Sequence, residues 1–262
     1  MIGRVLQRLW DGIPLPLRNW LLALASFVIL LVMWEVLPST GAINVFFTSS
    51  PSRIVLAAQW LFQHGLWNDI LVSLGEFMLG MVLAILLGIF VGFMIGWYGT
   101  LRAIVEPYVN MLNATPRVAL FPLLILWLGI GIESKIAAVF LGAFFPIVIS
   151  VMKGVKTVDP ELIKCARSFG AKDRQVFTTL TLPACLPFII SGLQIGVGRG
   201  LVGVVIGEML AAQAGVGHMM AQASATFQTD KVFVGLVLLT GFGFVLTEII
   251  KQIEKRFDSW RI

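Results

Sequence analysis

Charged residues are scarce in this chain. Of its 262 residues only 13% are Asp, Glu, Lys or Arg, whereas 58% are hydrophobic and the mean hydropathy is +0.93. One soluble core could not hide so much apolar surface, so the composition excludes a soluble globular protein. It predicts an all-α, polytopic membrane protein whose spans each need roughly 20 mostly apolar residues.

Groups that carry out chemistry are also few. The two cysteines, Cys165 and Cys185, lie in or beside a segment that the charge pattern below assigns to the cytoplasm, where a disulfide is not expected. His64 and His218 are each isolated, which favours surface groups over metal ligands. No G-x-x-x-x-G-K-[ST] loop is present to hold phosphates. We therefore expect no catalytic residue, metal or cofactor in this chain.

Six apolar stretches are candidate membrane helices. The less apolar stretch 103–116 contains Pro107 and Pro116, and it predicts a helix interrupted near the membrane. The whole chain, 1–262, is expected to form one transmembrane domain. The six candidate spans cover about 20–37, 71–98, 117–132, 135–152, 184–212 and 232–250.

Basic residues divide unequally between the loops, and basic loops tend to stay cytoplasmic. With the N-terminus inside, the outer set is only Arg53, Lys135 and Lys231. This pattern places in the cytoplasm the N-terminal segment 1–19, the loop 153–183 and the tail 251–262. The inner set has fourteen members: Arg4, Arg8, Arg18, Arg102, Lys153, Lys156, Lys164, Arg167, Lys172, Arg174, Lys251, Lys255, Arg256 and Arg261.

Glycines recur at helical spacing in two of the spans. Gly88, Gly92 and Gly96 lie along one side of the second span, and a second stripe follows the fifth span. Such stripes indicate close helix–helix packing, although glycine is also common in membrane helices generally. The members of the second stripe are Gly192, Gly196, Gly200, Gly203 and Gly207.

A charged, amphipathic segment, ELIKCARSFGAKDRQVFTTLTLP, stands between two apolar stretches at 161–183. Asp159 is suited to cap a helix that has Pro160 at its first position, and Gly170 permits a turn near its end. We expect one short helix to about Phe169 and a second from Ala171 to about Thr179, ending before Leu182 and Pro183.

This segment resembles the cytoplasmic loop of permease subunits in bacterial ATP-binding-cassette importers. In that family a Glu-Ala-Ala triplet is followed by Gly and then by Ile-x-Leu-Pro at fixed spacings. Here Lys164, Cys165 and Ala166 stand at the triplet, and Gly170 follows at the right distance. Leu182 and Pro183 close the motif. Lys164 reverses the charge of the usual Glu. The resemblance covers nearly the whole chain and is closest to the nitrate, sulfonate and taurine importers.

The resemblance implies a type I importer permease fold with six transmembrane helices. It implies that Glu161 and the residues of the motif dock onto a cytoplasmic ATPase, which binds ATP and Mg. It also implies an extracytoplasmic binding protein and a second permease copy, so that the assembly is a homodimer of this chain or a heterodimer. The solute would be a small anion of the nitrate, sulfonate or taurine type.

Ionisable residues inside spans are costly and usually face a pathway or a partner. The candidates for the translocation pathway are Arg117, Arg199 and Glu208, together with Asn113. Each arginine either contacts the solute or makes a structural pair. Glu208 lies on nearly the opposite side of the fifth span from Arg199, so these two are not expected to pair.

Two alternatives fit parts of the pattern. The first is a secondary transporter driven by an ion gradient, with Glu76 or Glu208 as its proton carrier. The second is a membrane scaffold or receptor that uses the segment 161–183 only for docking.

Overall fold

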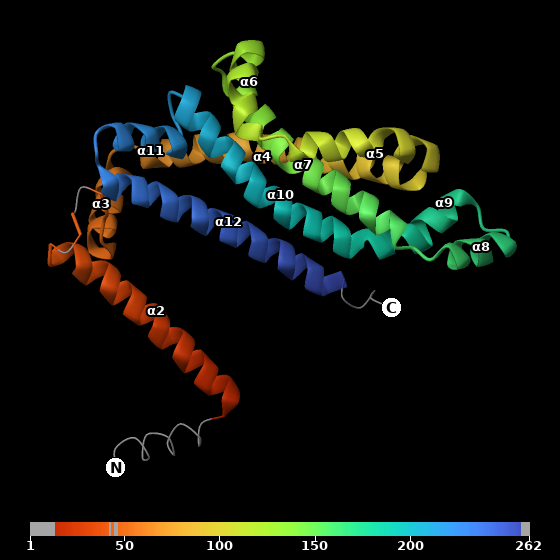
Figure 1. Ribbon diagram of the computed structural model, residues 1–262, viewed down its shortest axis with the longest axis horizontal. Helices are drawn as coiled ribbons and strands as arrows, with labels where there is room; N and C mark the ends of the chain where they lie inside the picture. The colour runs from red at the N-terminus through yellow and green to blue at the C-terminus, as the bar shows by residue number, and fades with distance from the viewer. Residues whose placement is uncertain (1–13, 42, 45–46, 258–262) are drawn as a thin grey trace. The chain divides into compact units, whose positions relative to one another are not determined.

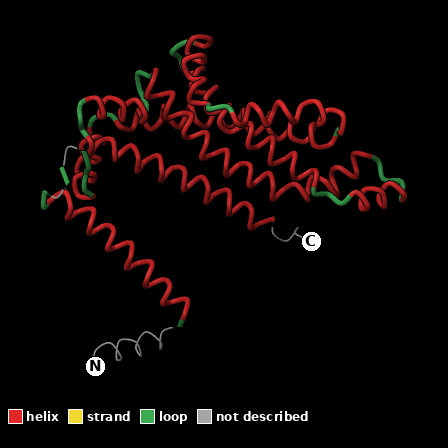
Figure 2. The backbone as a smooth tube through the Cα atoms, in the orientation of Figure 1, coloured by secondary structure: helices red, strands yellow, loops and turns green. Residues whose placement is uncertain are grey.

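A computed structural model describes residues 14–257, except for 42, 45 and 46. Parts of the expected N-terminal segment 1–19 and of the tail 251–262 therefore lie outside the described residues. The described chain is helical and has no strand (Figure 2). It divides into two compact units, one of residues 1–63 and 223–234 and one of residues 64–222 and 235–262.

The smaller unit contains α2 (Leu15–Ser39), α3 (Pro51–Gln63) and the start of α12 (Thr229–Phe257). The larger unit holds the remaining elements. They are α4 (Leu66–Trp97), α5 (Gly99–Ala114), the 3-10 helix η1 (Arg117–Leu120), α6 (Phe121–Leu128), α7 (Ile132–Lys156), α8 (Pro160–Ser168), α9 (Asp173–Val176), the π-helix η2 (Phe177–Thr181), α10 (Leu182–Ala211), most of α11 (Val216–Ala225) and the rest of α12.

By length and composition, five helices are long and apolar enough to cross a membrane, and the number is six if one bent pair of helices is counted as a single span. The five correspond to the expected spans and extend beyond them, covering Arg18–Ser39, Leu66–Trp97, Ile132–Lys156, Asp173–Ala211 and Thr229–Arg256. The all-α fold with six spans is confirmed, with the bent pair as the third.

The third span differs from its expected form. Instead of one helix over 117–132, the structure has Gly99–Ala114 and Arg117–Leu128 meeting at an angle of 89°. Thr115 precedes a proline and is held extended, with ψ at 131°, and Pro116 has no N–H to continue the helix. Pro107 stays inside α5 without breaking it. The interruption expected near the membrane is therefore confirmed, at Pro116.

Helix α7 forms the centre of the larger unit and packs against both α4 and α10. The glycines of α4 allow this approach, since a Cβ on Gly92 would lie 2.7 Å from the Cβ of Val151. On α10, a Cβ on Gly203 would lie 2.8 Å from the carbonyl oxygen of Ala138. Both glycine stripes are thus confirmed as close-packing surfaces.

The loop between α7 and α10 extends from the end of the larger unit opposite α11 (Figure 1). Asp159 caps α8 by accepting a 2.8 Å hydrogen bond from the Glu161 N–H, and Gly170 turns the chain with φ at +82°. The expected second helix does not end before Leu182. It continues through η2 into α10, because the N–H of Leu182 bonds the carbonyl of Phe177 in π-helical register. Pro183 lies in the first turn of α10, where its missing N–H is tolerated.

Candidate functional site

A cavity of about 680 Å³ opens where the third span bends. Its walls come from the end of α5, from η1 and α6, and from α7 and α10, all within the larger unit. Apolar side chains such as Phe121, Leu124 and Ile206 line much of it. Asn113, Arg117 and Arg199 line it as well, so three of the four predicted pathway residues meet there.

Asn113 joins the two arginines. Its Oδ1 accepts a hydrogen bond of 2.8 Å from Nη2 of Arg117 and one of 3.4 Å from Nη1 of Arg199. Arg117 also donates to the Asn113 carbonyl at 3.2 Å, and its Nε is buried without a hydrogen-bond partner. Among the described residues no carboxylate lies within ion-pair distance of either guanidinium. The bend at Pro116 brings Asn113 and Arg117 to the same point of the wall.

Glu208 is not part of this cavity. It is fully buried, and it accepts a 2.5 Å hydrogen bond from the Ser73 hydroxyl and a 2.6 Å bond from the Gly217 N–H. Ser73 in turn accepts from the Val216 N–H, and Asp69 accepts from the Gly215 N–H. We call these three acceptors, Asp69, Ser73 and Glu208, the α11 clamp. It fastens the N-terminus of α11 to α4 and α10 by three successive backbone N–H groups.

The turn in the clamp requires glycine at two positions. Gly215 has φ at +117°, and a Cβ there would lie 2.5 Å from the Cδ of Glu208. A Cβ on Gly217 would lie 2.6 Å from the carbonyl oxygen of Val205. Sequence reasoning missed this arrangement, because its members are separated by up to 148 positions, from Asp69 to Gly217. The pair of glycines after the fifth span was its only local signal.

A second buried pair involves Glu76. Its Oε1 lies 3.6 Å from Nζ of Lys135, and both side chains are buried. The charge pattern places Lys135 in an outer loop, but this residue lies in the first turn of α7, and its Nζ also donates to the Ile130 carbonyl at 3.3 Å. Each partner compensates the charge of the other. Without Lys135 the outer set contains two basic residues, so the charge asymmetry persists.

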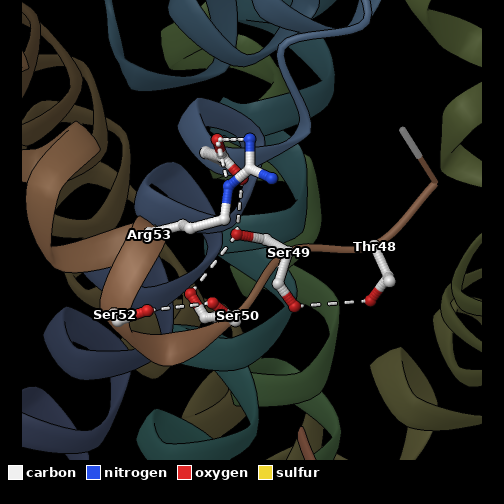
Figure 3. Close-up of polar contacts among 6 residues, drawn as sticks. Thr48, Ser49, Ser50, Ser52 and Arg53 are labelled. Atoms are coloured by element: carbon white, nitrogen blue, oxygen red, sulfur yellow. Dashed lines mark hydrogen bonds and ion pairs between the residues drawn. The ribbon is translucent and has the colours of Figure 1, made fainter. Parts of the chain in front are cut away.

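The smaller unit has a polar junction of its own (Figure 3). Ser49 donates to Oδ1 of Asp230 at 2.7 Å, while Arg53 binds Oδ2 of the same carboxylate at 3.0 Å. Beside them, the hydroxyls of Ser50 and Ser52 are 3.1 Å apart and share a hydrogen bond, which is drawn as a dashed line in Figure 3. This junction ties the start of α3 to the start of α12, so the serines of this segment serve a structural role.

The predicted docking residues are mostly exposed on the loop between α7 and α10. Glu161, Lys164, Cys165 and Gly170 are exposed, whereas Ala166, Leu182 and Pro183 are half-buried. Arg167 of α8 holds Asp173 of α9 in an ion pair of 2.9 Å, so the two arms of the loop are joined.

Two large apolar side chains of this loop escaped the sequence reasoning. Phe169 is 89% exposed and Leu162 is 55% exposed. In a segment outside the spans, such side chains indicate a surface that binds another protein. In the sequence they are the large apolar residues that stand on either side of the triplet 164–166.

These features define a class of protein: a polytopic helical membrane protein with a cationic cavity at a broken span and a protruding loop joined directly to two spans. No group of His, Cys, Asp and Glu that could hold a metal occurs in the part of the chain that the structure describes.

The comparisons with known proteins identify the family. Residues 84–259 match the family described as binding-protein-dependent transport system inner membrane component. The chain belongs to this family and is a multi-pass permease subunit of an ATP-binding-cassette transporter. It is 36% identical over 241 residues to a probable ABC transporter permease protein of Brucella abortus (strain 2308), covering 92% of this chain and 95% of the relative.

A second relative has a substrate in its name. The taurine transport system permease protein TauC of Escherichia coli (strain K12) is 32% identical over 249 residues, covering 93% of this chain and 90% of TauC. Among solved structures, an inward-facing conformation of the MetNI methionine ABC transporter aligns with a TM-score of 0.64 at 20% identity. That alignment covers 76% of this chain and 96% of the other. The structural match establishes the type I importer permease fold.

Proposed function

We propose that this permease serves an ATP-driven importer and forms the passage for a small anionic solute of the nitrate, sulfonate or taurine type. The observation that carries the choice of solute is the cavity with two guanidiniums and no compensating carboxylate. The name of the relative TauC is consistent with a sulfonate head group, because taurine is a zwitterion whose anionic end is a sulfonate. An extracytoplasmic binding protein delivers the solute, as the description of the family implies.

The loop from α8 to α9 is the coupling element of this proposal. Phe169 and Leu162 offer apolar surface to a cytoplasmic ATPase, and the motif residues Glu161, Lys164, Cys165, Ala166 and Gly170 lie between or beside them. The continuous helix from Asp173 to Ala211 joins the loop rigidly to α10, and the exposed ion pair of Arg167 with Asp173 links the two arms of the loop. A displacement of the loop by the ATPase is therefore transmitted to α10, the helix that contains Arg199.

Energy is supplied by the partner in this proposal. ATP and Mg bind to the ATPase, and this chain contributes no catalytic residue. Two copies of the permease form a homodimer around the passage, with two ATPases on the cytoplasmic side. The basic segments 1–19, 153–183 and 251–262 lie in the cytoplasm, as the distribution of Lys and Arg indicates.

The test of this function is uptake into vesicles that contain the permease, its ATPase and its binding protein. Replacement of the phosphate-loop lysine of the ATPase should abolish uptake, while collapse of the ion gradients should leave it intact. Uptake that survives the lysine replacement and stops when the gradients collapse would instead establish a secondary transporter. Absence of solute-stimulated ATP hydrolysis and of uptake would point to a scaffold.

Docking is tested by Phe169→Ala. Truncation removes a side chain that is 89% exposed, so the permease itself should stay folded while its association with the ATPase weakens about tenfold or more. The matched control is Phe90→Ala, since Phe90 is 61% exposed but lies within the α4 span. Equal ATPase binding by the two variants would argue against a contact at Phe169.

A further inference from the structure

We propose that Arg117 and Arg199, bridged by Asn113, form an oxyanion-binding site within the permease. The site takes the monoanionic head group of the solute, such as a sulfonate, as it passes. This inference rests on the proposed function and adds that the permease itself recognises charge, in addition to any selection by the binding protein.

The charge balance of the cluster supports an anionic ligand. Lys135 has Glu76 at 3.6 Å and Lys156 has Glu106 at 2.8 Å, so each of these two basic side chains of the larger unit is paired with an acid. Arg117 and Arg199 share only the neutral amide oxygen of Asn113. The amide oxygen of Asn113 is neutral and leaves both positive charges uncompensated. Arg117 is half-buried and Arg199 is exposed, and the two charges repel one another. A bound anion would remove both penalties.

The hydrogen-bonding capacity of the cluster is also unfilled. Each guanidinium has five N–H donors in a planar fork that matches the oxygens of an oxyanion. Nε of Arg117 is buried without a partner. The bond from Arg199 to Asn113, at 3.4 Å, is long and therefore weak. An oxyanion that displaces the Asn113 oxygen can accept from both arginines, and a rotated Asn113 can donate its NH₂ group to it.

The surroundings indicate a small ligand that is bound weakly. The cavity volume of about 680 Å³ exceeds that of a head group alone, and walls such as Phe121 and Ile206 can accept a short apolar chain. A site within a passage must hold its ligand weakly enough to release it. The neutral bridge of Asn113 serves this purpose, because it competes with the anion for the same donors.

Anion binding can be measured without knowledge of the natural solute. The purified complex of permease and ATPase, free of binding protein, is titrated with methanesulfonate, with acetate and with the neutral methanesulfonamide, and thermal unfolding is followed. We expect a saturable rise in melting temperature with an anion and none with the sulfonamide. The ratio of the sulfonate and acetate effects then identifies the preferred head group. Absence of a saturable shift with both anions would overturn the proposal.

Variants locate the site. Arg117→Gln and Arg199→Gln should each weaken the anion affinity about tenfold to a hundredfold, because each removes charge-assisted hydrogen bonds. Arg199→Lys keeps the charge and should bind with intermediate affinity, which separates recognition from a loss of folding. The matched control is Lys251→Gln, which removes a charge outside the cavity beside Glu248 and should leave the affinity unchanged. Undiminished binding in both glutamine variants would exclude this site.

Failure of the inference differs from failure of the proposed function. If uptake needs the phosphate-loop lysine of the ATPase but the anion affinity is unchanged by substitution of Arg117 and Arg199, the proposed importer function is retained and the oxyanion site is refuted. If the rise in melting temperature with an anion depends on both arginines but uptake does not depend on the ATPase, the oxyanion site is retained and the importer function is refuted.

Discussion

Removal of the carboxylate of Glu208 should unfasten α11. Glu208 accepts two short hydrogen bonds, from the Ser73 hydroxyl and from the Gly217 N–H, and it is completely buried. A buried donor that loses its acceptor costs about 1–3 kcal/mol, so with two donors affected Glu208→Ala should lower the free energy of unfolding by about 2–6 kcal/mol. Glu208→Gln keeps one acceptor oxygen and turns an NH₂ group toward the other donor, so it should cost about half as much.

Two measurements check this prediction. Thermal unfolding of the detergent-purified permease should rank the melting temperatures as wild type, then Glu208→Gln, then Glu208→Ala. Hydrogen exchange should show faster exchange at the Gly217 amide in Glu208→Ala, because that N–H loses its acceptor.

The control for the clamp is Glu248→Gln. Glu248 is a carboxylate of α12 that is 39% exposed and pairs only loosely with Lys251 at 3.6 Å, so its loss should change neither measurement. The reasoning is refuted if Glu208→Ala has the same melting temperature as the wild type. It is also refuted if the Gly217 amide keeps its protection from hydrogen exchange while the melting temperature falls.

The remaining predictions concern the coupling loop and the centre of the larger unit. Gly170→Val should separate ATP hydrolysis from uptake, because valine disfavours φ at +82° although no atom lies within 4 Å of its Cβ; coupled uptake at the normal ratio would contradict this. Lys164→Glu should leave uptake nearly unchanged, since the side chain is exposed and screened, and a large loss would indicate a strong pair with the ATPase. Gly92→Leu should destabilise the permease by about 1–3 kcal/mol, measured by thermal unfolding, because its Cβ would lie 2.7 Å from that of Val151; a smaller loss in Gly92→Ala would support the steric cause.

Local patterns predicted much of the fold. Each long span is a continuous apolar run, so its length and composition sufficed. The cap of Asp159 on α8 and the turn at Gly170 were equally readable, because both depend on residues within a few positions. The end of the second coupling helix could not be predicted in this way, since it continues in π-helical register through 177–181 to Leu182.

Separation along the chain also decides which contacts of the predicted pathway residues could be foreseen. Asn113 and Arg117 are four positions apart, so their proximity follows from the sequence once the break at Pro116 is known. Arg199 reaches them from 86 positions away through the packing of α10, and a Cβ on Gly142 would lie 2.7 Å from its carbonyl oxygen. Glu208 has the same residue type as a pathway acid, but its packing against α4 and α11 makes it a structural acceptor.

The class of this protein, its long helical spans, the cap and turn of the first coupling helix and the family to which it belongs could all be predicted from the sequence, because hydropathy, capping residues and motif spacing act over a few neighbouring positions. The packing of the helices was needed to show that two arginines share one asparagine, that Lys135 is buried against Glu76, and that Glu208 fastens α11. These contacts join residues far apart in the chain, and burial, which sets the energy of a charge, depends on all the helices around it.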